Sequence, residues 1–151
     1  MSVIYSNYGA FAALKTDGSV VTWGNSRAGG NSYVNDGHPN YNNITNVSSS
    51  LSSGVVVVYS ANYAFAALKT DGSVVSWGWE SFGGDLGKIY DYVNSAYVLV
   101  SDVSSDLTSG VSKIFSTNFA FAALKNDGSV VTWGYDERGG DSSSVSDQLN
   151  P

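Results

Sequence analysis

Apolar and polar residues alternate in two short runs on either side of an Asp-Gly pair, and this pattern occurs three times along the chain. The stretch AFAALKTDGSVVTWG occupies residues 10–24, AFAALKTDGSVVSWG occupies 64–78 and AFAALKNDGSVVTWG occupies 120–134. Two alternating runs around Asp-Gly predict a β-hairpin, here with a type I′ turn. Folding the chain at that turn predicts that Leu14 pairs with Val21 and Ala12 with Trp23 on one face.

Both faces of this predicted hairpin are largely apolar. The second face is predicted to hold Phe11, Ala13, Val20 and Thr22. Antiparallel hairpins commonly bury one face and leave the other in water, so a hairpin with two apolar faces is expected to lie between two layers. Asp and Gly suit tight turns, and we expect a structural role for Asp17, Gly18, Asp71, Gly72, Asp127 and Gly128.

The repeat extends on both sides of the hairpin. VIYS, VVYS and KIFS precede it and predict an inner strand, while a Gly-Gly corner and a Val-x-x-x-Leu element follow it. We expect the region near Val47 to form an outer strand. The chain is then a single repeat domain, with units of about residues 1–54, 55–110 and 111–151. Small antiparallel sheets of three or four strands, each apolar on both faces, predict the blades of an all-β propeller.

These residues resemble the repeat of the regulator of chromosome condensation family. The blade pattern of that family is a Val/Ile strand, a strand ending in Ala-Leu, a Gly turn, a strand ending in Trp-Gly and a Gly-rich corner. Here it reads VVYSANYAFAALKTDGSVVSWGWESFGGDLG, from Val57 to Gly87. The resemblance implies a β-propeller. It implies no single function, because the family includes an exchange factor for a small GTPase and a secreted β-lactamase inhibitor.

The chain departs from the family in two respects. Its corners read GGNS, GGDLG and GGDS in place of GQLG, and the Gly-His that often precedes the Ala-Leu strand is absent. We therefore carry over no contact residue of the exchange factor or of the inhibitor. The second departure is the number of repeats, since family members usually close a complete ring and this sequence supplies three units.

Three blades cannot close a ring, because propellers need about four to eight. Two flat apolar faces would remain exposed at the ends of the row. We therefore expect a homo-oligomer, either a dimer that closes a ring or a head-to-tail filament. A longer array, of which this chain is a part, is an open alternative. A β-trefoil is the alternative fold, because a trefoil closes with three units and needs no partner.

Composition narrows the partners and the location. Hydrophobic residues make up 42% of the chain and charged residues 13%, with a net charge of −6. An acidic chain with scattered basic residues would be repelled by nucleic acid. We expect no membrane insertion, because the apolar runs are too short, and the start MSVIYSNYGA does not resemble a signal peptide. Ser-rich, nearly identical repeats favour an extracellular, cell-surface or virion protein over a cytoplasmic one.

The sequence offers little for catalysis or for a cofactor. His38 is the single histidine, and there is no cysteine, so serine nucleophiles lack their usual base and thiolate metal sites are excluded. Acidic residues gather at the corners, namely Glu80, Asp85, Asp136, Glu137 and Asp141. They offer hard oxygen ligands, but no Asp-x-Asp-x-Asp-Gly calcium loop is present. We expect no catalytic residue, no metal and no cofactor.

Aromatic residues near the corners are the candidate ligand-binding residues. Tyr and Trp together with Ser and Asn are typical of adaptable binding surfaces and of sugar stacking. The candidates are Trp79, Phe82, Tyr90, Tyr92, Tyr97, Tyr135, Tyr33 and Tyr41. Alternatively, they pack the inserts of the first two repeats, YVNDGHPNYNNITN and GKIYDYVNSAYVLVSD, onto the blades.

The expected function is that of a non-enzymatic, self-assembling binding or structural module with a protein or glycan ligand. A carbohydrate-binding lectin is the alternative, with sugar stacking on Trp79 or Tyr135. A glycoside hydrolase is less favoured, because it requires two carboxylates in one cleft.

Overall fold

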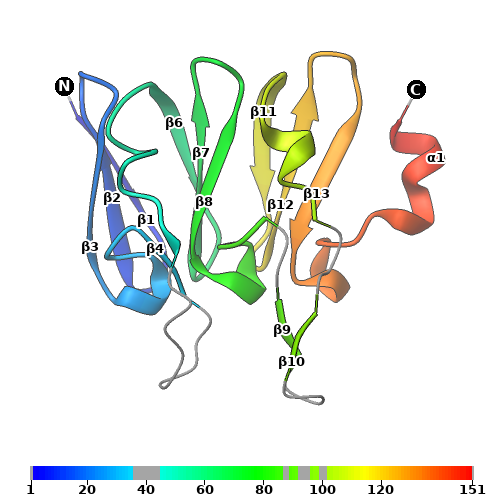
Figure 1. Ribbon diagram of the computed structural model, residues 1–151, viewed down its shortest axis with the longest axis horizontal. Coiled ribbons are helices and arrows are strands. Elements are labelled where there is room, and N and C mark those ends of the chain that lie inside the picture. The colour runs from blue at the N-terminus through cyan, green and yellow to red at the C-terminus, as the bar shows by residue number, and fades with distance from the viewer. Residues whose placement is uncertain (1, 36–44, 87–88, 92–95, 99–101, 151) are drawn as a thin grey trace.

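The chain folds into three antiparallel β-sheets that stand side by side in chain order (Figure 1). The computed structural model describes residues 2–35, 45–86, 89–91, 96–98 and 102–150. The first blade is formed by β1 (Val3–Ser6), β2 (Ala10–Leu14) and β3 (Val20–Gly24). The second contains β6 (Val55–Ser60), β7 (Ala64–Lys69) and β8 (Val74–Trp79). The third is formed by β11 (Val111–Ser116), β12 (Ala120–Lys125) and β13 (Val130–Gly134).

The inserts add strands outside this repeating core. From the first insert, β4 (Tyr33–Asn35) pairs in parallel with β8 of the second blade, and β5 (Thr45–Asn46) pairs with β4. The middle sheet therefore has five strands, in the order β5-β4-β8-β7-β6. From the second insert, β9 (Ile89–Asp91) and β10 (Ala96–Val98) form a separate two-stranded ribbon.

The predicted register of the hairpin is wrong by one residue. Phe11 lies opposite Trp23 and Leu14 opposite Val20, because the turn is not type I′. The Gly18 N–H donates to the carbonyl of Lys15 at 3.0 Å, and only Gly18 in this turn has a positive φ, at 79°. A type I turn followed by one left-handed glycine makes a three-residue loop. The odd loop length places Phe11 and Trp23 on the same face.

Near Val47 the predicted outer strand is confined to β5 (Thr45–Asn46), and the Val-x-x-x-Leu elements themselves are helical turns rather than strands. They comprise a turn at 47–51, the 3₁₀ helix η3 (Ser105–Leu107), and η5 (Ser143–Val145) followed by α1 (Ser146–Leu149). A helical turn brings residues four apart to one side, so in the first two repeats Val and Leu both point into the gap between blades. Leu51 and Leu107 are accordingly buried there.

The Gly-Gly corners follow the last strand of each blade. They form the short 3₁₀ helices η1 (Ser26–Ala28), η2 (Glu80–Phe82) and η4 (Asp136–Arg138), each ended by a glycine in the left-handed region. In Figure 1 the hairpin turns lie at the upper end of the blades and these corners at the lower end.

Two hydrophobic cores lie between the blades rather than inside them. The first joins Leu14 and Leu51 of the first repeat to Phe65 and Trp77 of the second. The second core joins the second blade to the third in the same way. The second and third blades thus bury their Phe–Trp faces against the preceding blade. This face-to-face stacking of separate sheets confirms the propeller-blade prediction and differs from the β-trefoil alternative.

Candidate functional site

Three of the predicted ligand-binding residues come together at the corner end of the blades. Trp79 ends β8, Phe82 lies in η2, and Tyr135 directly follows β13. Tyr33, Tyr90 and Tyr97 lie in the insert strands β4, β9 and β10, where Tyr90 is the backbone partner of Tyr97. Tyr41 and Tyr92 are outside the described residues, as is His38.

Phe82 is at the centre of a continuous group of aromatic rings. Its ring centroid lies 5.0 Å from that of Trp79, 5.1 Å from Tyr63, 5.4 Å from Phe119 and 6.5 Å from Tyr135. Tyr8 extends the group to the first blade, with its ring 5.2 Å from that of Tyr63. We call these six rings the aromatic row: Tyr8, Tyr63, Trp79, Phe82, Phe119 and Tyr135.

Sequence reasoning missed Tyr8, Tyr63 and Phe119. Tyr63 and Phe119 directly precede β7 and β12, whereas Trp79 is the last residue of β8 and Tyr135 directly follows β13. The backbone joins these ends, since the Trp79 N–H donates to the Tyr63 carbonyl and the Tyr135 N–H to the Phe119 carbonyl, both at 2.9 Å. In the second blade this pairing places the two rings together, with the centroids of Tyr63 and Trp79 5.5 Å apart, and it was the available signal.

Two arginines border the aromatic row. The guanidinium carbon of Arg138 lies 5.3 Å from the Phe119 ring centroid, and that of Arg27 lies 6.0 Å from Trp79. Exposed cation–π contacts of this kind contribute about 0.5–1 kcal/mol each. Aromatic residues with arginine are the side chains that dominate protein–protein interfaces. The row thus has the composition of a surface that binds another macromolecule.

The Phe–Trp pair of each blade forms a second candidate surface. The rings stack with centroids 5.3 Å apart in all three blades, as Phe11–Trp23, Phe65–Trp77 and Phe121–Trp133. Phe65 and Trp77 are 0% exposed, whereas Phe11 and Trp23 are 43% and 42% exposed. We call the surface of the first blade around Phe11 and Trp23 the N-terminal face.

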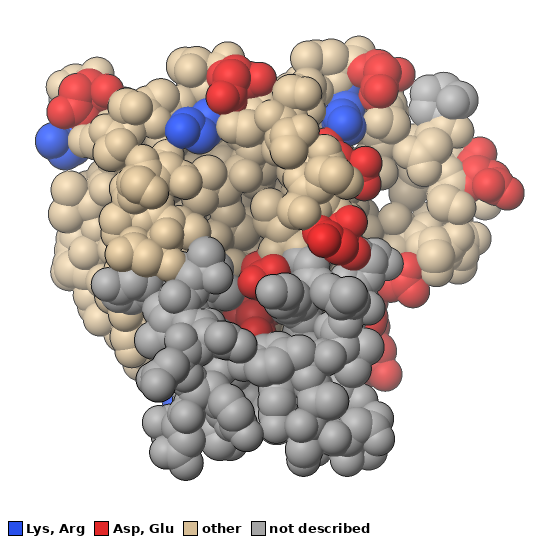
Figure 2. All heavy atoms as spheres, viewed as in Figure 1, with Lys and Arg blue, Asp and Glu red and all other residues tan. Residues whose placement is uncertain are grey.

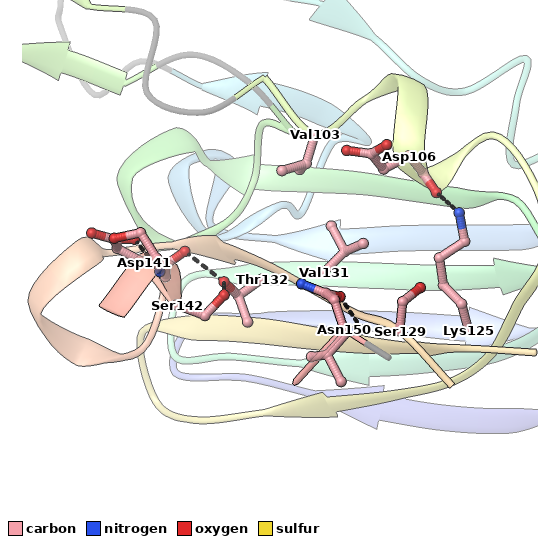
Figure 3. A pocket seen from close by; sticks show the side chains of 12 residues that line it. Val103, Asp106, Lys125, Ser129, Val131, Thr132, Asp141, Ser142 and Asn150 are labelled. Atoms are coloured by element: carbon pink, nitrogen blue, oxygen red, sulfur yellow. Dashed lines mark hydrogen bonds between the residues drawn. The ribbon is translucent and has the colours of Figure 1, made fainter. Parts of the chain in front are cut away.

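The outer surface of the third blade lies at the opposite end of the three stacked blades and is here called the C-terminal face. It includes β13 and the η5–α1 segment. A hollow of about 350 Å³ beside them is lined by Val131, Thr132 and Asn150 on one side and by Val103 and Asp106 of the second repeat on the other (Figure 3). The Thr132 hydroxyl donates to the Gly140 carbonyl at 3.0 Å, and Asn150 accepts from the Val130 N–H at 3.3 Å.

Carboxylates at the hairpin turns have a structural role. Figure 2 shows an acidic group with a basic group beside it at each of the three turns. The hydroxyl and N–H of Ser73 both donate to Asp71 and lower the pKa of that carboxyl. The same bonds lower the pKa of Asp127 through Ser129, and of Asp17 through Ser19 with a further bond from Lys15.

The acidic corner of the third blade does not form a metal centre in the structure. Within the described ranges, no three Asp, Glu or His side chains converge as metal ligands. Partial burial raises the pKa of Asp136, and the charges of Asp141 and Glu137 raise it further. Asp141 instead accepts the Ser143 N–H at 2.8 Å, which lowers its pKa. The helices of the described ranges are too short to cross a membrane.

No family model and no curated protein sequence matches this chain. Solved structures do match. Yeast RCC1 (Prp20), solved with Kap60 bound, gives a TM-score of 0.52 at 20% identity, over 87% of this chain and 29% of that one. Saccharomyces cerevisiae Prp20p, reported with its binding to Gsp1p and histones, gives 0.52 at 16% identity over 90% and 33%. Human WBSCR16 gives 0.49 at 24% identity, over 86% and 33%.

The likeness to the two yeast RCC1 structures agrees with the family resemblance that the repeat residues indicate. The chain spans about a third of the length of the RCC1 proteins that it matches. Its fold is that of three consecutive blades of an RCC1-type β-propeller.

Proposed function

We propose that this chain is a non-enzymatic β-propeller module that self-associates through its end faces and binds a protein ligand at its corner end. The observation that carries the proposal is the exposure of Phe11 and Trp23. The equivalent residues of the other blades are fully buried, and a stacked Phe–Trp pair left in water is a typical protein-binding surface.

The aromatic row supports the protein ligand. Its rings pass from blade to blade without a gap, and Arg27 and Arg138 lie beside it. The yeast protein of the same fold has been solved with Kap60, and its binding to Gsp1p and histones has been described. A protein partner for this chain is consistent with those relatives.

A surface or virion setting is part of the proposal. The chain has 13% charged residues and takes most of its polarity from Ser, Asn, Thr and Gly. A neutral, hydroxyl-rich surface and nearly identical repeats suit a structural protein of a secreted, cell-surface or virion assembly.

Sedimentation velocity of the purified chain tests self-association. We expect a mass above the 15.9 kDa of one chain, and a return to that mass when Val21→Glu places a charge on the N-terminal face. Val56→Glu is the matched control, because Val56 in the second blade is as exposed as Val21, at 54% against 52%. A wild-type chain that sediments as a monomer at micromolar concentration would contradict the proposal.

A carbohydrate ligand is the second candidate, favoured by the exposure of Tyr8 and Tyr135 in the aromatic row. Tyr135 is 42% exposed, and an exposed aromatic face can stack on a sugar ring. Binding of the chain to a glycan array, lost in Tyr135→Ala, would support a lectin. An array without hits would exclude that candidate and leave the protein ligand.

A further inference from the structure

We propose that the N-terminal face is covered by the C-terminal face of a second copy of this chain, and that two copies close a six-bladed ring. The inference rests on the proposed self-association and specifies its partner, its residue pairs and its stoichiometry. It is carried by the interface between neighbouring blades, which occurs twice within the chain. The first and third blades also present the two halves of that interface, one at each end of the stack.

The first residue pair is Trp23 with Gly139. Between the first two blades, the Trp77 indole Nε1 donates to the Gly29 carbonyl at 3.1 Å. Between the second and third, Trp133 Nε1 donates to the Gly83 carbonyl at 3.2 Å. Gly139 is the equivalent corner glycine of the third blade, and no atom lies within 4 Å of the position that its Cβ would take. Trp23 is the equivalent donor on the first blade.

The second pair is Tyr8 with Asn118. A ladder of backbone hydrogen bonds joins successive blades, from the Tyr8 N–H to the Asn62 carbonyl at 3.0 Å and from the Asn62 N–H to the Asn118 carbonyl at 2.9 Å. Continued by one step, the ladder would join the Asn118 N–H to a residue of the next blade. The Tyr8 carbonyl of a second copy is the acceptor that occupies the equivalent position.

The third pair is Lys15 with Gln148. Lys69 Nζ donates to the Ser50 carbonyl at 3.0 Å, and Lys125 Nζ donates to the Asp106 carbonyl at 2.8 Å. Each lysine thereby holds the helical turn that closes the preceding repeat. Lys15 has no such turn before it and bonds to Asp17 instead, at 3.1 Å. Gln148 occupies the position of Ser50 and Asp106 in the third repeat.

The apolar surfaces of the two ends also correspond. Ile4 is 61% exposed on β1, whereas its equivalents Val58 and Ile114 are 2% and 1% exposed. On the other end, Val145 is exposed, whereas the equivalent Val47 and Val103 are buried against the next blade. A first blade seated there would bury both sets of residues.

Ring closure fixes the number of copies. Each copy supplies three blades, and six is the only multiple of three in the closed range of about four to eight blades. A closed dimer has no free end, whereas a head-to-tail filament leaves one N-terminal and one C-terminal face uncovered at any length. Closure therefore buries more apolar surface per chain than a short filament does.

Cysteine cross-linking tests the pairing, since the chain has no cysteine of its own. Tyr8→Cys and Asn118→Cys are prepared as separate single variants and treated with a short bis-maleimide, alone and mixed. The proposal expects a covalent species of twice the 15.9 kDa chain mass in the mixture only. The double variant Asn62→Cys/Asn118→Cys is the control, because those residues adjoin within one chain and should cross-link without a change in mass.

Other outcomes overturn the inference while leaving self-association intact. Cross-linking of either single variant with itself would show that like faces meet. A ladder of trimers and larger species from the double variant Tyr8→Cys/Asn118→Cys would show a filament, whereas a ring stops at two chains. If wild type and variants all sediment as monomers, the proposed function fails as well, and faces that require further blades of a longer chain become the alternative.

Discussion

Trp77 donates a hydrogen bond from its indole nitrogen to the carbonyl oxygen of Gly29, 48 residues earlier in the chain. The bond crosses from the second blade to the first and is buried. A Cβ on Gly29 would lie 2.9 Å from Cδ1 of Trp77 and 3.0 Å from Cδ2 of Phe65, so the glycine is what allows the rings to approach. The same spacing of Trp and Gly recurs in each repeat, and it thus forms both a blade and the contact between that blade and its neighbour.

Trp77→Ala should lower the free energy of unfolding by about 3–5 kcal/mol, because it removes a fully buried indole and leaves a cavity. Trp23→Ala should cost the isolated chain much less, since Trp23 is exposed. Urea denaturation of both variants at a concentration where the chains are monomeric measures the difference. Equal losses would mean that the Phe–Trp pair acts within a blade rather than between blades.

The sequence predicted the blades because the repeat shows its own period and because two apolar faces require two neighbours. It did not predict the register. Whether an Asp-Gly hairpin uses a two-residue or a three-residue loop depends on the φ of Asp17, which the residue types leave open. That single choice moved Phe11 from the face opposite Trp23 onto the same face.

The candidate site was predicted only in part, and for a related reason. Trp79 and Phe82 could be chosen by residue type and by their place beside the Gly-Gly corner. Tyr63 could be found only by pairing the residue before β7 with the last residue of β8, which requires the register. The helical turns at Val-x-x-x-Leu were taken for strands because a five-residue element with two apolar ends fits either period.

Phe82→Ala should destabilise the chain by about 2 kcal/mol, which is less than the ~3–5 kcal/mol of a fully buried phenylalanine. Phe82 is half-buried, and its ring contacts those of Tyr63, Trp79 and Phe119. The blade itself should still form, because the equivalent positions hold Ala28 and Arg138 in the other repeats.

Thermal unfolding followed by far-ultraviolet circular dichroism checks the effect of Phe82→Ala. Intrinsic tryptophan fluorescence should change as well, since Trp79 loses the ring beside it. An unchanged melting temperature would show that the aromatic row contributes nothing to folding. The row would then serve only as a surface.

Asp71→Asn should remove part of the acid sensitivity of the fold. The folded-state pKa of Asp71 is held below its ordinary value of 3.8 by the Ser73 hydroxyl and N–H and by the charge of Lys69. A lowered folded-state pKa gives stability that is present above the unfolded-state pKa, about 3.9, and is lost as pH falls through the folded-state pKa.

The difference between the midpoints of thermal unfolding of wild type and Asp71→Asn should therefore stay constant from pH 7 down to about pH 4. Below about pH 4 the two midpoints should converge as the pH falls to about 2. The asparagine can still accept the Ser73 N–H but carries no charge to lose. A carboxyl titration followed by NMR gives the Asp71 pKa directly. Midpoints that run parallel over the whole range would contradict a lowered pKa.

Gly83→Ala and Gly139→Ala form a matched pair that separates backbone strain from packing. Both glycines are left-handed, with φ of 90° and 104°, so each substitution carries a similar strain of about 1–2 kcal/mol. At Gly83 the new methyl would also meet Cδ2 of Phe121 at 2.6 Å, whereas at Gly139 it meets nothing within one chain. Gly83→Ala should therefore destabilise the monomer more than Gly139→Ala does, as measured by urea denaturation at low concentration.

The self-association of the same two variants should differ in a second way. If Trp23 of a second copy packs on Gly139, Gly139→Ala introduces into the joint between chains the clash that Gly83→Ala introduces within one. Sedimentation velocity should then show Gly139→Ala as a folded monomer at concentrations where the wild type associates. A Gly139→Ala chain that associates as well as the wild type would place the contact between copies elsewhere on the molecule.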